Sequence, residues 1–160
     1  MLLAAVAAPP AGSQPSPPCM GAELSGTFRV VPGSAGAGNI VYALRVTNVS
    51  KADCFVTGIP QLTLLNRTGK LLPTHIRPAQ PGALTAVRVD LAPGRTAKAT
   101  ARFSPDVPGV GEGQTGPCEP TAYKLRVGPS AGGTLLAPVQ PPTPVCEHGT
   151  MTLTPLVSAG

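Results

Sequence analysis

Apolar and polar side chains alternate along this chain with a period of two, and no other feature constrains the fold as strongly. The clearest example is 40–47, where Ile40, Tyr42 and Leu44 share one face and Arg45 lies on the other. The same alternation recurs in three later segments, 83–91, 96–103 and 121–127. Because successive side chains of a β-strand point to opposite faces, the pattern predicts half-buried strands rather than helices.

Proline and glycine supply the turns between these segments. The 160 residues include 21 prolines and 19 glycines, and many fall between apolar runs, as in Pro32-Gly33 and Pro93-Gly94. Two further polar turns are predicted at 48–51 and 66–70. Eight or nine short strands with such spacing predict an all-β fold, an immunoglobulin-like antiparallel β-sandwich. The Cys–Trp–Cys signature of antibody domains is absent, since the chain contains no Trp.

Four cysteines are available to strengthen a core that is poor in aromatic residues. Aromatic side chains make up 3% of the chain, so the core is built mostly from Val, Leu, Ile and Ala and buries modest apolar area per residue. The even count and the lack of a C-x-x-C pair predict two disulfides among Cys19, Cys54, Cys118 and Cys146. Three pairings are open. We favour Cys19–Cys54 and Cys118–Cys146, because each would close a loop of moderate length between adjacent strands.

The N-terminal residues point to export. An apolar run, 1–8, contains Ala5-Val6-Ala7, an A-x-A cleavage signature, and is followed by Pro- and Ser-rich sequence. We interpret 1–18 as a signal-peptide remnant or a disordered Pro/Ser-rich segment, and 19–157 as a single β-sandwich domain. No apolar run is long enough to span a bilayer. The expected location is secreted or in the extracytoplasmic cell envelope.

Positive charge on the outward strand positions suggests a partner. The formal net charge is +5 at pH 7. The strand alternation places six cations outward: Arg45, Arg88, Lys98, Arg102, Lys124 and Arg126. They form either a surface for an anionic ligand or solvated charge that prevents strand edges from pairing. Nucleic acid is not an expected partner, because no aromatic side chains interleave with the cations.

The sequence contains no recognisable catalytic or cofactor motif. There is no G-x-S-x-G elbow and no phosphate-binding loop, and the two histidines are His75 and His148. The segment 146–151 (CEHGTM) groups residue types that bind soft metals. We interpret it as a disulfide followed by a polar loop, with a metal site as the weaker alternative. No catalytic site, metal or cofactor is therefore predicted.

Several short motifs, taken in order, resemble a known family. They are 39–48 (NIVYALRVTN), 54–60 (CFVTGIP), 91–94 (LAPG), Cys118-Glu119-Pro120 and Cys146. Their order and the four cysteines resemble an actinobacterial family of small exported domains known as a domain of unknown function, DUF4232. The resemblance covers Cys19 to Leu156. It implies an all-β domain that is secreted or anchored in the envelope, and it implies no activity and no site residues.

Together these features predict a non-catalytic secreted or cell-envelope module that binds an envelope protein or an anionic cell-wall polymer. Two alternatives stay open. The first is a structural spacer with no specific ligand. The second is a periplasmic-type metal carrier.

Overall fold

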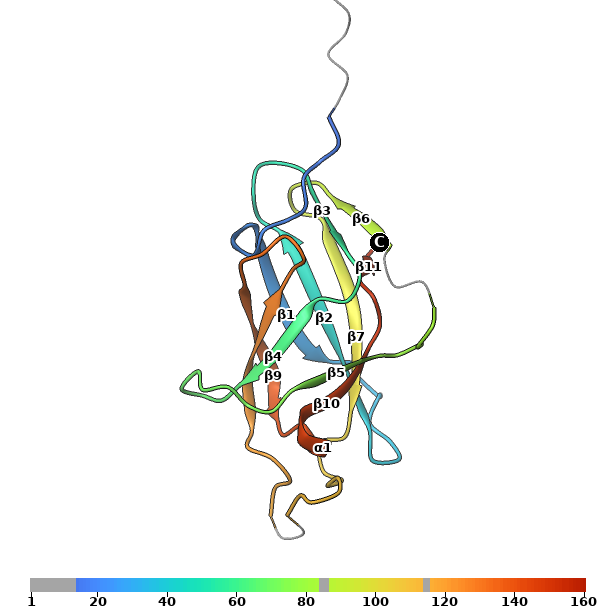
Figure 1. Ribbon diagram of the computed structural model, residues 1–160, viewed down its shortest axis with the longest axis vertical. Helices are drawn as coiled ribbons and strands as arrows, with labels where there is room; N and C mark the ends of the chain where they lie inside the picture. Colours follow the sequence, from blue (N-terminus) through green and yellow to red (C-terminus); the bar gives the residue numbers. More distant parts are fainter. Residues whose placement is uncertain (1–13, 84–86, 114–115) are drawn as a thin grey trace, which may run out of the picture.

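The computed structural model describes residues 14–83, 87–113 and 116–160 of the chain (Figure 1). Almost all of its regular structure is β. The elements are η1 (Gly21–Glu23), β1 (Leu24–Val30), β2 (Ile40–Asn48), β3 (Cys54–Thr57), β4 (Gln61–Leu65), β5 (His75–Pro78), β6 (Arg88–Leu91), β7 (Thr96–Phe103), β8 (Ala122–Gly128), β9 (Leu135–Thr143), α1 (Cys146–Gly149), β10 (Thr150–Leu153) and β11 (Val157–Ser158). The predicted cleavage signature at 5–7 and part of the strand predicted at 83–91 lie outside the described residues.

One large sheet carries most of the strands, in the order β4-β8-β9-β1-β2-β7-β10-β5, with β11 paired to β7. The β3–β6 pair lies apart from it, at the end of the molecule opposite α1 (Figure 1). The pairs β1–β9 and β10–β5 are parallel, and the other pairs are antiparallel.

The two outer strands of the large sheet approach each other. The N–H of Leu72 donates to the carbonyl of Leu64 at 2.9 Å, and the N–H of Leu64 donates to Thr74 Oγ1 at 2.9 Å. The sheet is therefore nearly closed into a barrel. The predicted all-β fold with two disulfides is confirmed, whereas an immunoglobulin-like antiparallel sandwich describes this mixed, curled sheet only loosely.

The register of β1, β2 and β7 follows the predicted alternation. Leu44 lies opposite Phe28 on one side and Ala99 on the other, and all three side chains are buried. One residue along β2, Arg45 is exposed. A shift of one residue would exchange these two sets, so burial of the apolar face fixes the register.

Three of the five aromatic side chains are gathered in the centre of this core. Tyr42 lies between Phe28 and Phe103, with ring centroids 5.0 and 5.1 Å apart. Its hydroxyl donates to the carbonyl of Pro141 at 2.8 Å, which satisfies the buried polar end of the ring.

The disulfides have the pairing that we favoured. Cys19–Cys54 joins the chain before β1 to β3, and Cys118–Cys146 joins the chain before β8 to α1. Next to the first disulfide, the N–H of Phe55 donates to the carbonyl of Pro17 at 3.0 Å. Ordered contacts therefore begin before Cys19.

Asn48, at the end of β2, fastens the predicted 48–51 turn to the rest of the domain. Its side chain is 0% exposed. Nδ2 donates to the carbonyls of Ala52 and Leu91 at 2.8 and 2.9 Å, and Oδ1 accepts from the N–H and hydroxyl of Ser50 at 2.9 and 2.8 Å. Every hydrogen-bonding group of this buried amide is used.

We expect Asn48→Ala to lower the free energy of unfolding by about 2 kcal/mol, because it leaves the buried carbonyl of Leu91 without its donor. Urea unfolding with the disulfides intact measures this. Asn66→Ala is the control: Asn66 also shapes a turn through Oδ1, but its hydrogen bonds face solvent, and the expected loss is under about 1 kcal/mol. Equal losses in the two variants would contradict a buried role for Asn48.

Candidate functional site

The structure brings three of the six predicted surface cations together. Arg45 on β2 lies directly opposite Lys98 on β7, and Arg102 follows on the same face of β7. All three are exposed. At 3.3 Å per residue, Lys98 and Arg102 are about 13 Å apart along the strand.

Two further arginines extend this surface. Arg29 on β1 lies opposite Ala43, which is next to Arg45 on the same face of β2 in the two-residue alternation. In the other direction, Arg102 lies opposite Thr152 on β10, and Thr152 lies opposite Arg77 on β5. We call the outward side of β1, β2, β7, β10 and β5 the basic face; its cations are Arg29, Arg45, Lys98, Arg102 and Arg77.

Among the described residues, no cation of the basic face is in an ion pair. The described outward residues of its five strands include no Asp or Glu. Within the part of the chain that the structure describes, the ion pairs are Arg88–Asp90 and His148–Glu119, neither of which involves a cation of this face. Like charges placed directly opposite on neighbouring strands, as in Arg45 and Lys98, destabilise a sheet. A bound anion would remove that cost.

The other three predicted cations lie elsewhere. Arg88 on β6 donates to Asp90 at 2.9 Å and covers the ring of Phe55 at 3.9 Å, so its charge is already used. Lys124 and Arg126 lie on β8, beyond β9, whose exposed side chains are uncharged. Of the six predicted cations, therefore, only Arg45, Lys98 and Arg102 lie on two directly paired strands of the large sheet.

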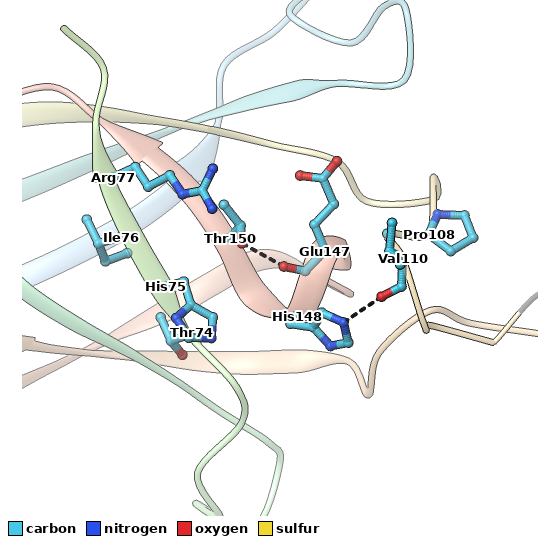
Figure 2. A pocket seen from close by; sticks show the side chains of 10 residues that line it. Thr74, His75, Ile76, Arg77, Pro108, Val110, Glu147, His148 and Thr150 are labelled. Carbon is cyan, nitrogen blue, oxygen red and sulfur yellow. Dashed lines mark hydrogen bonds between the residues drawn. The ribbon is translucent and has the colours of Figure 1, made fainter. Parts of the chain in front are cut away.

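An open pocket of about 870 Å³ lies at the β5 end of the basic face (Figure 2). His75 and Arg77 project into it from β5, and Glu147 and His148 project from α1 on the opposite side (Figure 2). Thr150, on β10, lies between the two walls.

The α1 wall is a left-handed turn. Glu147, His148 and Gly149 have φ values of 55°, 57° and 77°, a conformation that is unfavourable for the first two residues. Gly149 is required there, because a Cβ would collide with the backbone of Pro73. The Cys118–Cys146 disulfide attaches the start of the turn to the loop before β8.

The buried carboxylate of Glu112 holds this turn in place. Oε1 accepts from the N–H groups of Gly109 and Glu147, each at 2.5 Å, and Oε2 accepts from the N–H of His148 at 3.2 Å. The carboxyl of Glu119 forms a further hydrogen bond with Glu112. These contacts offset the conformational cost of the turn.

The pKa values of the two carboxyl groups are shifted in opposite directions. Desolvation raises the pKa of Glu112, but the hydrogen bonds from Gly109, His148, Glu119 and Glu147 together lower it to about 2. Desolvation, followed by the hydrogen bond and charge of Glu112, raises the pKa of Glu119. Glu112 therefore ionises before Glu119 as the pH rises.

Glu112, Glu119 and His148 place ligand atoms within 4.8 Å of one another, which suggests a metal site. Their hydrogen bonds argue against it. Glu112 is occupied by backbone N–H groups, and His148 Nε2 lies 3.0 Å from the carbonyl of Val110. In the segment 146–151, where a metal site was the weaker alternative, Cys146 is in a disulfide and Met151 is 0% exposed.

A family model described as a domain of unknown function (DUF4232) matches residues 19–157. The chain belongs to this DUF4232 family. The family resemblance predicted from the sequence is thus confirmed. No curated protein matches this DUF4232 domain.

The two disulfides of this DUF4232 domain fit an extracytoplasmic protein. No helix in the described ranges is long and apolar enough to cross a membrane.

Sequence reasoning overlooked Arg29, Arg77 and the Glu112–Glu119 pair. The sequence could have indicated Arg29, because Phe28 and Val30 on either side of it are apolar, as in an alternating strand. Arg77 could not be predicted from the sequence, because the four residues of β5 (HIRP) show no clear alternation. This strand also joins the sheet only through β10. The carboxyl pair depends on loop contacts that leave no local pattern.

The opposite pKa shifts of Glu112 and Glu119 predict a two-sided pH dependence of the free energy of unfolding. Glu112 has a lowered pKa, so its contribution is present above about pH 4.5 and is lost as the pH falls toward about 2. Glu119 has a raised pKa, so its contribution is present below about pH 4.5 and is lost as the pH rises through the raised value.

Glu119→Gln keeps a donor for Glu112 and removes the second titration. We expect this variant to gain stability relative to the wild type as the pH rises from 4.5 to 7, measured by urea unfolding at several pH values. Asp106→Asn is the control, because Asp106 is an exposed acidic residue of the loop between β7 and β8. If the curves of Glu119→Gln and the wild type stay parallel, the pKa of Glu119 is not raised in the folded protein.

Proposed function

We propose that this DUF4232 domain is a non-catalytic module, secreted or held in the cell envelope, that binds an anionic polymer on the basic face. The observation that carries the proposal is the uncompensated Arg45–Lys98 pair with Arg102 beside it. Its membership of a family without assigned activity leaves this function open.

The spacing of the cations favours an extended ligand. Lys98 and Arg102 lie about 13 Å apart along β7, and Arg77 lies two strands across from Arg102, about 10 Å away at the usual strand spacing. Charges spread over such an area cannot all contact one small anion. A chain with a repeating negative charge can contact several of them at once.

The basic face lacks the anchors that protein partners use. Protein interfaces are centred on aromatic side chains and arginine in desolvated pockets. Here Phe28, Tyr42 and Phe103 are buried, and Phe55 and Tyr123 are covered by Arg88 and Arg67. We therefore favour an anionic polymer over an envelope protein.

Two observations support a non-catalytic role. All four cysteines are in disulfides, so no thiol is available as a nucleophile. In the described part of the chain, the side-chain contacts of His148 are the carbonyl of Val110 and the carboxyl of Glu119, neither of which is a nucleophile that a histidine could activate. A spacer without a ligand is the second candidate, but it gives no reason to keep Arg45 opposite Lys98.

Removing three cations from the basic face should weaken polymer binding. We expect the triple variant Arg45→Gln, Lys98→Gln, Arg102→Gln to bind polyphosphate and poly-L-glutamate at least tenfold more weakly than the wild type, a loss of about 1.4 kcal/mol. Calorimetric titration at 50 and 300 mM salt measures this. The wild type should lose affinity at the higher salt concentration.

The control for this experiment is the triple variant Lys51→Gln, Lys124→Gln, Arg126→Gln, which removes the same charge from other surfaces. It should retain near wild-type affinity. Equal losses in the two triple variants would show that net charge alone attracts the polymer. A wild type that binds neither polyphosphate nor poly-L-glutamate would refute the proposal.

Reversing one charge should separate binding from stability. Lys98→Glu turns a repulsive cross-strand pair into an attractive one, so we expect it to raise the free energy of unfolding by about 0.5 kcal/mol while it weakens polymer binding. Lys51→Glu makes the same change in net charge in an exposed loop. It should change neither the free energy of unfolding nor the affinity for the polymer. Lower stability in Lys98→Glu, at low salt, would contradict repulsion between Arg45 and Lys98.

A further inference from the structure

The chain's two histidines, far apart in the sequence, line the same pocket. His75 comes from β5 and His148 from the left-handed turn, and both line the pocket, with the His148 ring directed toward the carbonyl of Val110 (Figure 2). Arg77 lies on the His75 wall and Glu147 on the His148 wall. No motif in the sequence brings these four residues together.

The pocket is continuous with the basic face. In the β10–β5 pair, Thr150 lies opposite His75 and Thr152 opposite Arg77, so both β5 side chains share the outward side of β10. Thr152 also lies opposite Arg102. A polymer that contacts Lys98 and Arg102 can therefore reach Arg77 and the pocket without leaving this side of the sheet.

Arg77 and His75 have hydrogen-bond donors to offer. Among the described residues, neither side chain has a hydrogen bond or an ion pair, and both are exposed. They lie two residues apart on the same face of β5, roughly 7 Å along the strand. Their donors can thus approach one anionic group from two directions.

His148 adds charge at a fixed position. Its Nε2 lies 3.0 Å from the carbonyl of Val110, and its Nδ1 lies 3.4 Å from Glu119 Oε1. Both nitrogens face acceptors, which favours the doubly protonated ring, and the pKa of His148 is raised, first by the Val110 contact. The backbone bond to Glu112 holds the residue against the pocket before any ligand arrives.

The charge of the pocket changes with pH. Arg77 contributes one positive charge and Glu147 one negative charge, which cancel, and each protonated histidine then adds one. The groups behind His148 are Glu119 and the carboxylate of Glu112. Protonation of both imidazoles therefore raises the charge of the lining by two.

We propose that this pocket is a pH-dependent subsite for a phosphate group, in which Arg77 and His75 donate to its oxygens and His148 supplies a facing positive charge. The inference rests on the proposed function, because the phosphate would belong to the bound polymer. A tetrahedral oxyanion presents oxygens toward both walls, whereas the two oxygens of a carboxylate lie in one plane. Free phosphate shares this chemistry.

The test uses sulfate as the probe, because it remains a tetrahedral dianion across the pH range, whereas phosphate itself titrates. NMR titrations of the full chain with sulfate follow the imidazole resonances of His75 and His148 at pH 5.8 and 8.0. We expect binding at least tenfold tighter at pH 5.8, and a raised pKa of both histidines when sulfate is bound, by linkage. Acetate at equal ionic strength should shift these resonances much less.

Arg77→Gln and His75→Gln should each weaken sulfate binding at pH 5.8 by about tenfold or more, while Arg95→Gln, which removes an exposed cation outside the pocket, should not. Backbone amide spectra check that each variant is folded. Sulfate affinity that is equal at the two pH values, unchanged in Arg77→Gln, or matched by acetate would overturn the phosphate subsite.

The two proposals can fail separately. If polyphosphate binds and depends on Arg45, Lys98 and Arg102 but sulfate leaves His75 and His148 unshifted, the subsite is wrong and the basic face stands. If sulfate binds in the pocket but no polymer binds, the proposed function is wrong and the pocket is a site for a free oxyanion. Binding of polyphosphate, but not of poly-L-glutamate, that weakens in Arg77→Gln supports the polymer as the source of the phosphate.

Discussion

The pairing register of β1, β2 and β7 determines both the core and the surface of this domain. Burial of Phe28, Leu44 and Ala99 fixes that register, and the two-residue period of the strands then places Arg45 opposite Lys98 on the outside. The basic face is thus a direct consequence of how the core packs. The repulsion between Arg45 and Lys98 costs little free energy compared with what burial of the core contributes. The fold therefore tolerates this like-charge pair, and a bound anion would relieve the repulsion.

The pocket at the β5 end of the basic face depends on a second interaction, the hydrogen bonds that backbone N–H groups donate to the carboxylate of Glu112. The left-handed turn at Glu147 and His148 is unfavourable in isolation, and the carboxylate, together with the Cys118–Cys146 disulfide, holds it. This places His148 across from His75. The same hydrogen bonds occupy the carboxylate, which is why the cluster that resembles a metal site acts as a structural support.

Local periodicity was enough to predict the all-β fold, most strands and the outward positions of Arg45, Lys98 and Arg102. It failed where tertiary contacts determine the orientation or the partners of a side chain. The alternation in 121–127 puts Tyr123 on the same side as Leu125 and Val127, but a register irregularity lies between Ala122 and Lys124, and the Tyr123 ring is covered by Arg67. Arg88 does point outward, but Asp90 and Phe55 use its charge, and no strand pattern shows such pairing. Arg77 and the two histidines meet through the parallel β10–β5 pair, which sequence spacing does not reveal.

The central claim is that an anionic polymer lies along β2 and β7. The most direct measurement is amide chemical-shift mapping of the ¹⁵N-labelled domain during titration with polyphosphate. The account predicts that the perturbed amides cluster around Arg45, Lys98 and Arg102 and continue toward β5. Perturbations centred on Lys124 and Arg126 of β8, or spread evenly over all cations, would contradict it.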